Sequence, residues 1–306
     1  MRVAAAAVAV LALAACGGGS DAIGAGDVEH VRELVNARAG GQVLSVAWSP
    51  DGKRVAAGAP DGAVVVDART GRIRSEIRTG SQVWGVAWNR KGNVVAAATE
   101  DGRVRLVPGR LLGSRFGSPA FAVAWSRDGR LAIGYASGIV RVLGPGRRDR
   151  PAKRHSAEVI AVAWSHDGDR LASGSIDATT RVGTAEFGVP QGADVNGVAW
   201  SPDDSRIVVA NQDGVVRVWD VAHRKLVRRL RGHTGWTRGV DWSPSGKLIA
   251  SSGADGTIRI WDAGDGKELR VLRAGRLEAW TVAWSPDGRR LASGDGDGDV
   301  RIWGLR

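Results

Sequence analysis

The sequence predicts an all-β protein, a seven-bladed β-propeller with four antiparallel strands in each blade. The first observation is a repeat: a version of the motif V-A-W-S-P-D-G occurs seven times in the chain. The copies follow one another at intervals of 36 to 42 residues, a period that indicates one supersecondary unit stacked many times. The second observation is composition, since 44 glycines and few phenylalanines or tyrosines fit short strands joined by tight turns. The tryptophans that mark the copies are Trp48, Trp88, Trp125, Trp164, Trp200, Trp242 and Trp284.

The strands of one unit are clearest in the sixth copy. Residues 240–242 form a short apolar strand, and Ser-Pro-Ser-Gly at 243–246 has the residue types of a turn. A second strand is predicted at 248–251. The third, Thr-Ile-Arg-Ile-Trp at 257–261, alternates polar and apolar residues as half-buried strands do. Residues 269–272 supply the fourth strand. A lone blade of this kind cannot bury both faces, so we expect seven blades to pack radially around a channel.

Two literal Trp-Asp pairs stand at 219–220 and 261–262, and a Gly-His pair precedes the sixth copy at 232–233. Over about residues 30–306 the chain therefore resembles the WD-repeat β-propeller family. The resemblance implies that a His, a Ser, an Asp and the Trp of the third strand form a hydrogen-bonded tetrad within a blade. The matching positions, complete only in the sixth copy, are His233, Ser251, Asp255 and Trp261.

The fourth copy keeps this tetrad only in part. It has His155, Ser173 and Asp177, but Gly183 stands where the tryptophan is expected. Such blades should depend more on apolar packing against their neighbours. The segment 184–192 is short and rich in glycine, so we expect the weakest blade there, and whether it has a full outer strand is left open.

The two ends of the propeller predict how the ring closes. The seventh copy stops at Trp303, after its third strand. Residues 30–34 (His-Val-Arg-Glu-Leu) align with the outer strand before the sixth copy, so an N-terminal strand should complete the last blade. Closure of this kind removes the exposed sheet edges. The alternative is a helix over residues 27–37, whose apolar residues also fit helical periodicity.

The N-terminal segment has the pattern of an export signal. Residues 1–15 hold Arg2 and a short apolar stretch, and Leu-Ala-Ala precedes Cys16, the single cysteine. This box resembles the lipobox of bacterial lipoproteins, which implies a cysteine lipidated with acyl chains such as palmitate. We therefore expect a signal peptide at 1–15, a flexible glycine-rich tether at 16–29 and the propeller at 30–306. The protein would be anchored by lipid to a membrane of the cell envelope, on its extracytoplasmic side. A plain secretory signal is the alternative.

The formal net charge of +11 raises the question of an anionic partner. Nucleic acid is the usual partner of a basic protein, but export argues against it, and none is predicted. Anionic lipid headgroups and cell-wall polymers are the more accessible surfaces. Basic residues gather at 147–154 and 223–231, and both clusters should lie on the circumference of the propeller. They form either a solvated face or a contact with such a polymer.

The residues four and six positions before each marker begin the inner strands and should surround one mouth of the channel. In WD-repeat propellers these positions commonly bind partners, so we predict a partner-binding rim there. Trp84, Trp236 and Trp280 would be its aromatic anchors, near Arg238. Alternatively, the rings plug the channel against one another. The rim comprises Leu44, Trp84, Phe121, Ile160, Asn196, Trp236, Arg238 and Trp280. The remaining residues six positions before a marker are Gln42, Gln82, Pro119, Glu158, Asp194 and Glu278.

No pattern in the sequence indicates catalysis or a cofactor. G-x-S-x-G and H-E-x-x-H are absent, and the five histidines are scattered over different copies. The alternating Asp295, Asp297 and Asp299 lack the spacing of a calcium loop and fall on a turn that recurs in other copies. The sequence therefore predicts a non-catalytic protein–protein interaction scaffold with an unidentified protein partner and no metal. The alternative is a propeller that binds a small molecule or glycan, with or without hydrolysis.

Overall fold

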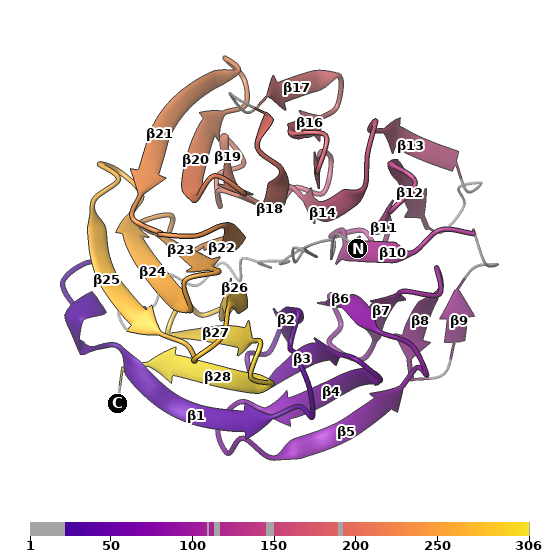
Figure 1. Cartoon of the computed structure of the whole chain (residues 1–306), viewed down its shortest axis with the longest axis horizontal. Coiled ribbons are helices and arrows are strands. Elements are labelled where there is room, and N and C mark those ends of the chain that lie inside the picture. The colour runs from indigo at the N-terminus through magenta and orange to yellow at the C-terminus, as the bar shows by residue number, and fades with distance from the viewer. Residues whose placement is uncertain (1–21, 109, 113–116, 145–149, 189–191, 306) are drawn as a thin grey trace.

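The computed structural model describes residues 22–108, 110–112, 117–144, 150–188 and 192–305. These residues form seven four-stranded antiparallel sheets, arranged as blades around a central axis (Figure 1). The predicted seven-bladed β-propeller is confirmed. One short 3-10 helix, η1 (Val28–His30), is the only helix in the described part of the chain.

The first four blades run from inner to outer strand in chain order. The first blade comprises β2 (Ser45–Trp48), β3 (Arg54–Ala59), β4 (Gly62–Asp67) and β5 (Ile73–Arg78). The second comprises β6 (Val83–Trp88), β7 (Val95–Thr99), β8 (Val104–Val107) and β9 (Arg110–Leu112). The third comprises β10 (Ala120–Trp125), β11 (Leu131–Tyr135), β12 (Ile139–Leu143) and β13 (Arg150–Arg154). The fourth comprises β14 (Val159–Trp164), β15 (Leu171–Ser175), β16 (Thr179–Val182) and β17 (Ala185–Gly188).

The last three blades complete the ring, and the N-terminal strand belongs to the seventh. The fifth blade comprises β18 (Val195–Trp200), β19 (Arg206–Asn211), β20 (Val215–Asp220) and β21 (Lys225–Arg231). The sixth comprises β22 (Thr237–Trp242), β23 (Leu248–Gly253), β24 (Thr257–Asp262) and β25 (Glu268–Arg273). The seventh comprises β26 (Ala279–Trp284), β27 (Arg290–Asp295), β28 (Asp299–Gly304) and β1 (Arg32–Arg38). In every blade the marker tryptophan ends the inner strand, which is buried along most of its length because both of its faces pack against other strands.

The ring closes through the N-terminal strand, as predicted. Strand β1 pairs antiparallel with β28, from Arg32 opposite Gly304 to Arg38 opposite Asp299. It begins two residues later than predicted and is longer, because η1 occupies the residues before it. The alternative helix over 27–37 is wrong beyond that single turn.

The chain before β1 is packed against the propeller. The main-chain N–H of Ile23 donates to the carbonyl of Gly288 at 3.0 Å. Ile23, Val28 and Val31 are buried in one apolar cluster with Trp303 and other side chains of blades six and seven. The described part of the predicted flexible tether, residues 22–29, is therefore docked on the propeller.

The fourth blade has the outer strand that the sequence left open. All four residues of β17 pair with β16, and Gly183 makes the turn between them with a φ of 59°. Phe187 is buried and packs edge-on against Trp219 of the fifth blade, with ring centroids 5.7 Å apart. The structure therefore answers the question of the outer strand, and β9 of the second blade is shorter than β17.

Four of the seven seams between blades share a combination of contacts that we call the seam pair. Nε1 of the marker tryptophan donates to a main-chain carbonyl of the preceding blade, at 3.0–3.2 Å. That carbonyl belongs to the residue immediately before the marker of the preceding blade. An arginine of the preceding blade stacks on the same ring, its Cζ 4.6–4.9 Å from the centroid, and donates through Nη2 to a turn carbonyl at 2.6–2.7 Å. The pairs are Trp48 with Arg290, Trp88 with Arg54, Trp164 with Arg130 and Trp200 with Arg170.

The other three seams lack the seam pair among the described residues. They join blades two and three, five and six, and six and seven. Nε1 of Trp125 and of Trp284 has no acceptor there, and Nε1 of Trp242 donates to Gly246 within its own blade at 3.0 Å. At the last of these seams, Leu248 stands in place of the arginine and packs in one cluster with Trp284. Blade six therefore lacks the seam pair on both sides.

Candidate functional site

The residues six positions before the markers lie at equivalent places on one edge of the ring. In six blades their main-chain carbonyl accepts an N–H from the residue that follows the second strand, at 2.8–3.1 Å. The first blade has Pro60 at the donor position, and proline has no N–H to donate. These residues therefore lie at the edge of the ring where the sequence analysis expects the channel mouth, and we keep that name for it. The six acceptors are Gln82, Pro119, Glu158, Asp194, Trp236 and Glu278.

The side chains four positions before the markers contact one another around the mouth. Trp84 packs edge-on against Phe121, with ring centroids 5.3 Å apart, and its Nε1 donates to Glu100. It also packs against Leu44 and Trp280 in one small apolar cluster. The structure thus brings these predicted rim residues together and agrees with the interpretation that the rings plug the mouth.

Most of the predicted rim is buried. Trp84 is partly exposed and Trp236 is well exposed, whereas Trp280 is buried. Trp280 is therefore not the exposed anchor that we expected. Asn196 donates through Nδ2 to the carbonyl of Thr237 at 2.7 Å and so ties blade five to blade six. The buried members are Leu44, Phe121, Ile160, Asn196, Arg238 and Trp280.

Two large apolar side chains remain exposed at the mouth, on neighbouring blades. Trp236 is 42% exposed and Leu277 is 51% exposed. Leu277 was missed, although a signal was present. Seven positions before the other markers the chain has only Gly, Ser or Ala, so a leucine there is an exception. Asp297 fixes the main chain at this point by accepting the N–H groups of Arg276 and Leu277, which lowers the pKa of Asp297.

Arg238 lies between two tryptophan rings at the same place. Its Cζ is 4.7 Å from the ring centroid of Trp236 and 4.2 Å from that of Trp280. Nη2 donates to the carboxylate of Glu278 on blade seven. Burial lowers the pKa of Arg238, and the neighbouring Glu278 opposes that effect. Within the described residues, Nε and Nη1 have no hydrogen-bond acceptor.

The predicted tetrad of the sixth blade is present. His233 lies 3.0 Å from Asp255 through Nδ1 and 2.8 Å from the Ser251 hydroxyl through Nε2. Trp261 Nε1 donates to the same hydroxyl at 2.8 Å. Although burial opposes ionisation, hydrogen bonds from His233 and Thr257 hold the pKa of Asp255 well below its usual value. The fourth blade has the same Ser, His and Asp contacts without the tryptophan.

A serine, a histidine and an aspartate at these distances also make up the triad of hydrolases. Here Ser251 is completely buried, and its oxygen accepts the indole N–H of Trp261. Ser173 of the fourth blade is completely buried as well. A substrate carbonyl has no access to either oxygen, so these two groups stabilise blades and do not form nucleophilic sites.

The seventh blade has a different lock, which sequence reasoning missed. Trp303 Nε1 donates to Ser293 at 2.8 Å, but Gly275 stands at the histidine position. In place of the histidine, Arg301 pairs with Asp295 and Asp299. The sequence did contain a signal for this different lock, because Asp295 stands where the sixth blade has Gly253.

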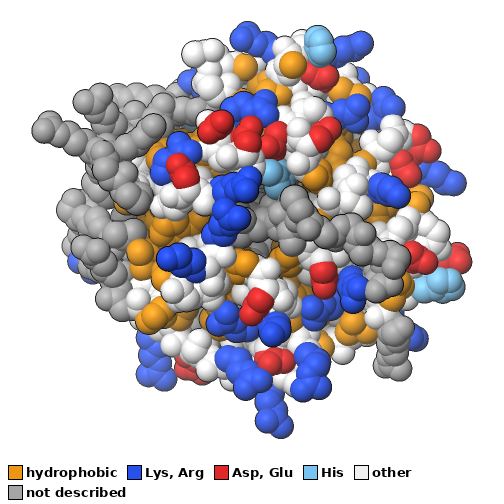
Figure 2. All heavy atoms as spheres, turned by 180° about the vertical axis from the view of Figure 1, so that it is seen from behind, with side chains coloured by type: hydrophobic (Ala, Val, Ile, Leu, Met, Phe, Trp, Pro, Cys, Tyr) orange, Lys and Arg blue, Asp and Glu red, His pale blue; other side chains and the backbone are white. Residues whose placement is uncertain are grey.

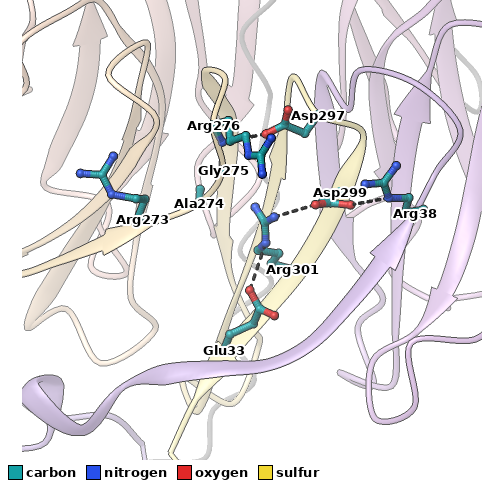
Figure 3. A pocket seen from close by; sticks show the side chains of 9 residues that line it. All are labelled: Glu33, Arg38, Arg273, Ala274, Gly275, Arg276, Asp297, Asp299 and Arg301. Carbon is teal, nitrogen blue, oxygen red and sulfur yellow. Dashed lines mark hydrogen bonds and ion pairs between the residues drawn. The ribbon is translucent and has the colours of Figure 1, made fainter.

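Arg301 also forms the floor of a polar pocket of about 640 Å³ at the ring closure (Figure 3). Its Nε lies 3.0 Å from Glu33 of β1 and its Nη2 lies 2.6 Å from Asp299, whose other oxygen faces Arg38 at 3.4 Å. Of the three carboxylates considered for calcium, Asp295 and Asp299 thus pair with guanidinium groups, and Asp297 accepts main-chain N–H groups. No cluster suited to a metal ion is found within the described ranges.

The basic clusters lie at the circumference where the structure describes them. Residues 147–149 are outside the described ranges, and 150–154 form β13 at the outer edge of the third blade. His223, Arg224 and Lys225 are exposed at the start of β21. On the face shown in Figure 2, Lys and Arg side chains are interspersed with Asp and Glu.

The predicted signal peptide and Cys16 lie outside the described residues. In the part that is described, no helix is long and apolar enough to cross a membrane.

Comparison with known families agrees with the observed blades. A model of the WD domain, G-beta repeat family matches residues 30–66, 73–107, 151–182, 186–220, 224–262 and 266–304. The stretch 108–150 is not matched, although β10, β11 and β12 of the third blade lie in it. No curated protein matches the chain. Propellers of this family are generally non-catalytic and typically serve as protein-interaction scaffolds. Because the six stretches cover most of its length, the chain belongs to the WD40 family.

Proposed function

We propose that this WD40 propeller is a non-catalytic scaffold that binds a protein partner at the mouth of blades six and seven. The observation that carries the proposal is the exposure of Trp236 and Leu277 beside the ion pair of the buried Arg238 with the partly exposed Glu278. Aromatic and arginine side chains at the centre of a patch, with carboxylates around them, have the composition of a binding hot spot.

Burial of Trp236 alone would contribute substantially to binding. The exposed part of the ring amounts to roughly 100 Å² of a tryptophan side chain. Removing that area from water stabilises a complex by about 2–3 kcal/mol. The pairing of Arg238 with both rings holds Trp236 in one orientation, so a partner would lose little affinity to ordering it.

We propose further that a lipid on Cys16 anchors the propeller to the cell envelope with the mouth facing away from the membrane. The packed N-terminal segment supports this orientation. Ile23 bonds to Gly288, in the turn after β26, whereas Trp280 and the mouth lie at the start of that strand. Six residues lie between Cys16 and Ile23, and the seven Cα–Cα steps that join them span at most about 25 Å. The formal net charge of +11, or +10 after Arg2 is removed with the signal peptide, would favour additional contact with anionic lipid or wall polymer.

Crosslinking in intact cells, followed by identification of the captured protein, tests the scaffold proposal. Trp236→Ala and Leu277→Ser should abolish capture. The matched controls are Ile73→Ser and Val271→Ser, which change equally exposed apolar side chains away from the mouth and should leave capture intact. Equal capture by all four variants would overturn the assignment of the mouth. Recovery of a glycan instead of a protein would favour the alternative function.

A further inference from the structure

The pocket at the ring closure opens where the seventh blade departs from the tetrad. In blade six His233 occupies the corresponding place, and its side chain is completely buried. The seventh blade has Gly275 at the histidine position, and Gly275 lines the pocket of about 640 Å³. A cavity of this volume is within the range of small-molecule sites. The absence of an imidazole therefore leaves room for a small ligand.

Arg276, the next residue, directs a cation into this pocket. Eight positions before the other markers the chain has only Gly, Ser or Thr, so an arginine here is an exception. Asp297 holds its main-chain N–H, but the exposed side chain has no hydrogen bond or ion pair within the described residues. In Figure 3 its guanidinium points toward Arg301 on the floor of the pocket. Guanidinium groups recognise carboxylate and phosphate groups through paired hydrogen bonds, so an anionic group suits this place.

Two more arginines with free donors line the same pocket. Arg38, at the end of β1, contacts Asp299 through Nε at 3.4 Å, and its side chain is 81% exposed. Arg273, at the end of β25, is exposed, and its side chain has no hydrogen bond or ion pair in the described ranges. Figure 3 shows these two arginines on opposite sides of Arg276. Their long side chains can therefore approach a bound anion from both sides.

The carboxylates of the pocket limit how much negative charge a ligand can carry. Glu33 and Asp299 pair with Arg301, and so does the buried Asp295. With Asp297, four carboxylates thus balance the four arginines that line the pocket. A single acidic group would meet the free guanidinium groups, whereas a second one would meet the carboxylates and be repelled.

Two of these carboxylates can also accept hydrogen bonds from a ligand. Glu33 pairs with Arg301 through Oε2, and its side chain is 42% exposed, so Oε1 remains an acceptor. Asp297 binds both main-chain N–H groups through Oδ2, which leaves Oδ1. Acceptors beside free guanidinium groups match a ligand with hydroxyl donors next to one acidic group. Sugar acids and sugar phosphates combine the two.

We propose that the pocket at the ring closure binds a sugar with one acidic group. Arg276 holds the carboxylate or phosphate, with Arg38 and Arg273 on either side. The hydroxyls of the sugar donate to Glu33 and Asp297. This inference goes beyond the proposed function, because it assigns a second site with a small-molecule ligand to the same propeller.

Isothermal titration of the full-length chain with glucuronate, glucose 6-phosphate and glucose tests the inference. The three share one sugar ring and differ in the group at its sixth carbon. Both acids should bind, more weakly as salt is raised, and glucose should bind at least about tenfold more weakly than either. Arg276→Thr should weaken binding of both acids by about tenfold or more. This variant has the residue of the sixth copy, where Thr234 makes the same main-chain hydrogen bond to an aspartate. Arg229→Thr, which changes an exposed arginine of β21, is the matched control and should bind as wild type does.

Four results would overturn the inference. Glucose binding as tightly as the acids would show that the arginines do not select the ligand. Inorganic phosphate binding as tightly as glucose 6-phosphate would show that the sugar is not recognised. Equal affinity of Arg276→Thr and wild type would place the bound acid elsewhere on the basic surface. No binding of either acid would refute the site outright. None of these results bears on the scaffold proposal, which crosslinking tests through other side chains.

Discussion

Asp241 is the clearest point at which a single substitution should change the pH dependence of stability. It occupies the position just before a marker, where the other six copies have alanine. The carboxyl group is completely buried and accepts the main-chain N–H of Trp242 at 2.9 Å and that of Trp284, across the seam to blade seven, at 2.7 Å. Burial outweighs both hydrogen bonds and raises the pKa of Asp241 from 3.8 to about 8.

The sign of the effect follows from the two states. The folded protein keeps the proton of Asp241 up to about pH 8, whereas the unfolded chain releases it near 3.8. Between these values the folded state holds the extra proton, so stability falls as the pH rises. This group alone should lower the free energy of unfolding by roughly 1.4 kcal/mol per pH unit, or about 3 kcal/mol between pH 5 and pH 7.

Urea unfolding followed by tryptophan fluorescence at pH 5, 6, 7 and 8 measures this slope. Asp241→Ala should fold well, because alanine fits the equivalent position in six blades. Relative to wild type, the variant should gain stability steadily from pH 5 to pH 8. Asp169→Ala, which removes an exposed carboxylate, should follow the wild-type slope. Parallel stability curves for Asp241→Ala and wild type would refute the reasoning.

Three further predictions concern single side chains. Ser251→Ala removes the acceptor of Trp261 Nε1, so the free energy of unfolding should fall by about 1–3 kcal/mol; unchanged urea unfolding would contradict a stabilising tetrad. Arg290→Ala removes the seam pair that closes the ring and should destabilise the protein by about 1–2 kcal/mol in the same assay. Arg206→Ala is its control, because no contact of that side chain across a seam is described. Cys16→Ala should abolish incorporation of radiolabelled palmitate, and equal labelling of this variant would refute the lipoprotein prediction.

The architecture was predictable because it depends on features that the chain repeats. One marker every forty residues or so is enough to place an inner strand, and seven of them determine the ring. The start of β1 was not predictable in the same way. It lies at Arg32 because Val28 and Ile23 are buried against blades six and seven, and a contact so distant in sequence leaves no periodic signal.

The predicted rim residues meet at one edge of the ring, but the sequence did not predict which of their side chains are exposed. Counting back from the markers brings together Trp84, Trp280 and Arg238, because equivalent positions meet at one edge of the ring. Whether a ring there is buried depends on its neighbours in space. Trp280 is covered because Leu44 and Arg238 pack on it, whereas no side chain covers Leu277 to the same extent.

Blade six combines the complete tetrad with the absence of the seam pair on both sides, and this combination connects its stability to its surface. It is joined to its neighbours by polar side chains instead. Thr237 exchanges hydrogen bonds with the main chain of Asn211 in blade five, and Arg238 pairs with Glu278 in blade seven. Both links lie at the end of the inner strand that forms the mouth. Trp236, the exposed aromatic side chain of the proposed binding site, stacks on the same arginine, so a partner bound there would lie against a contact that also holds two blades together.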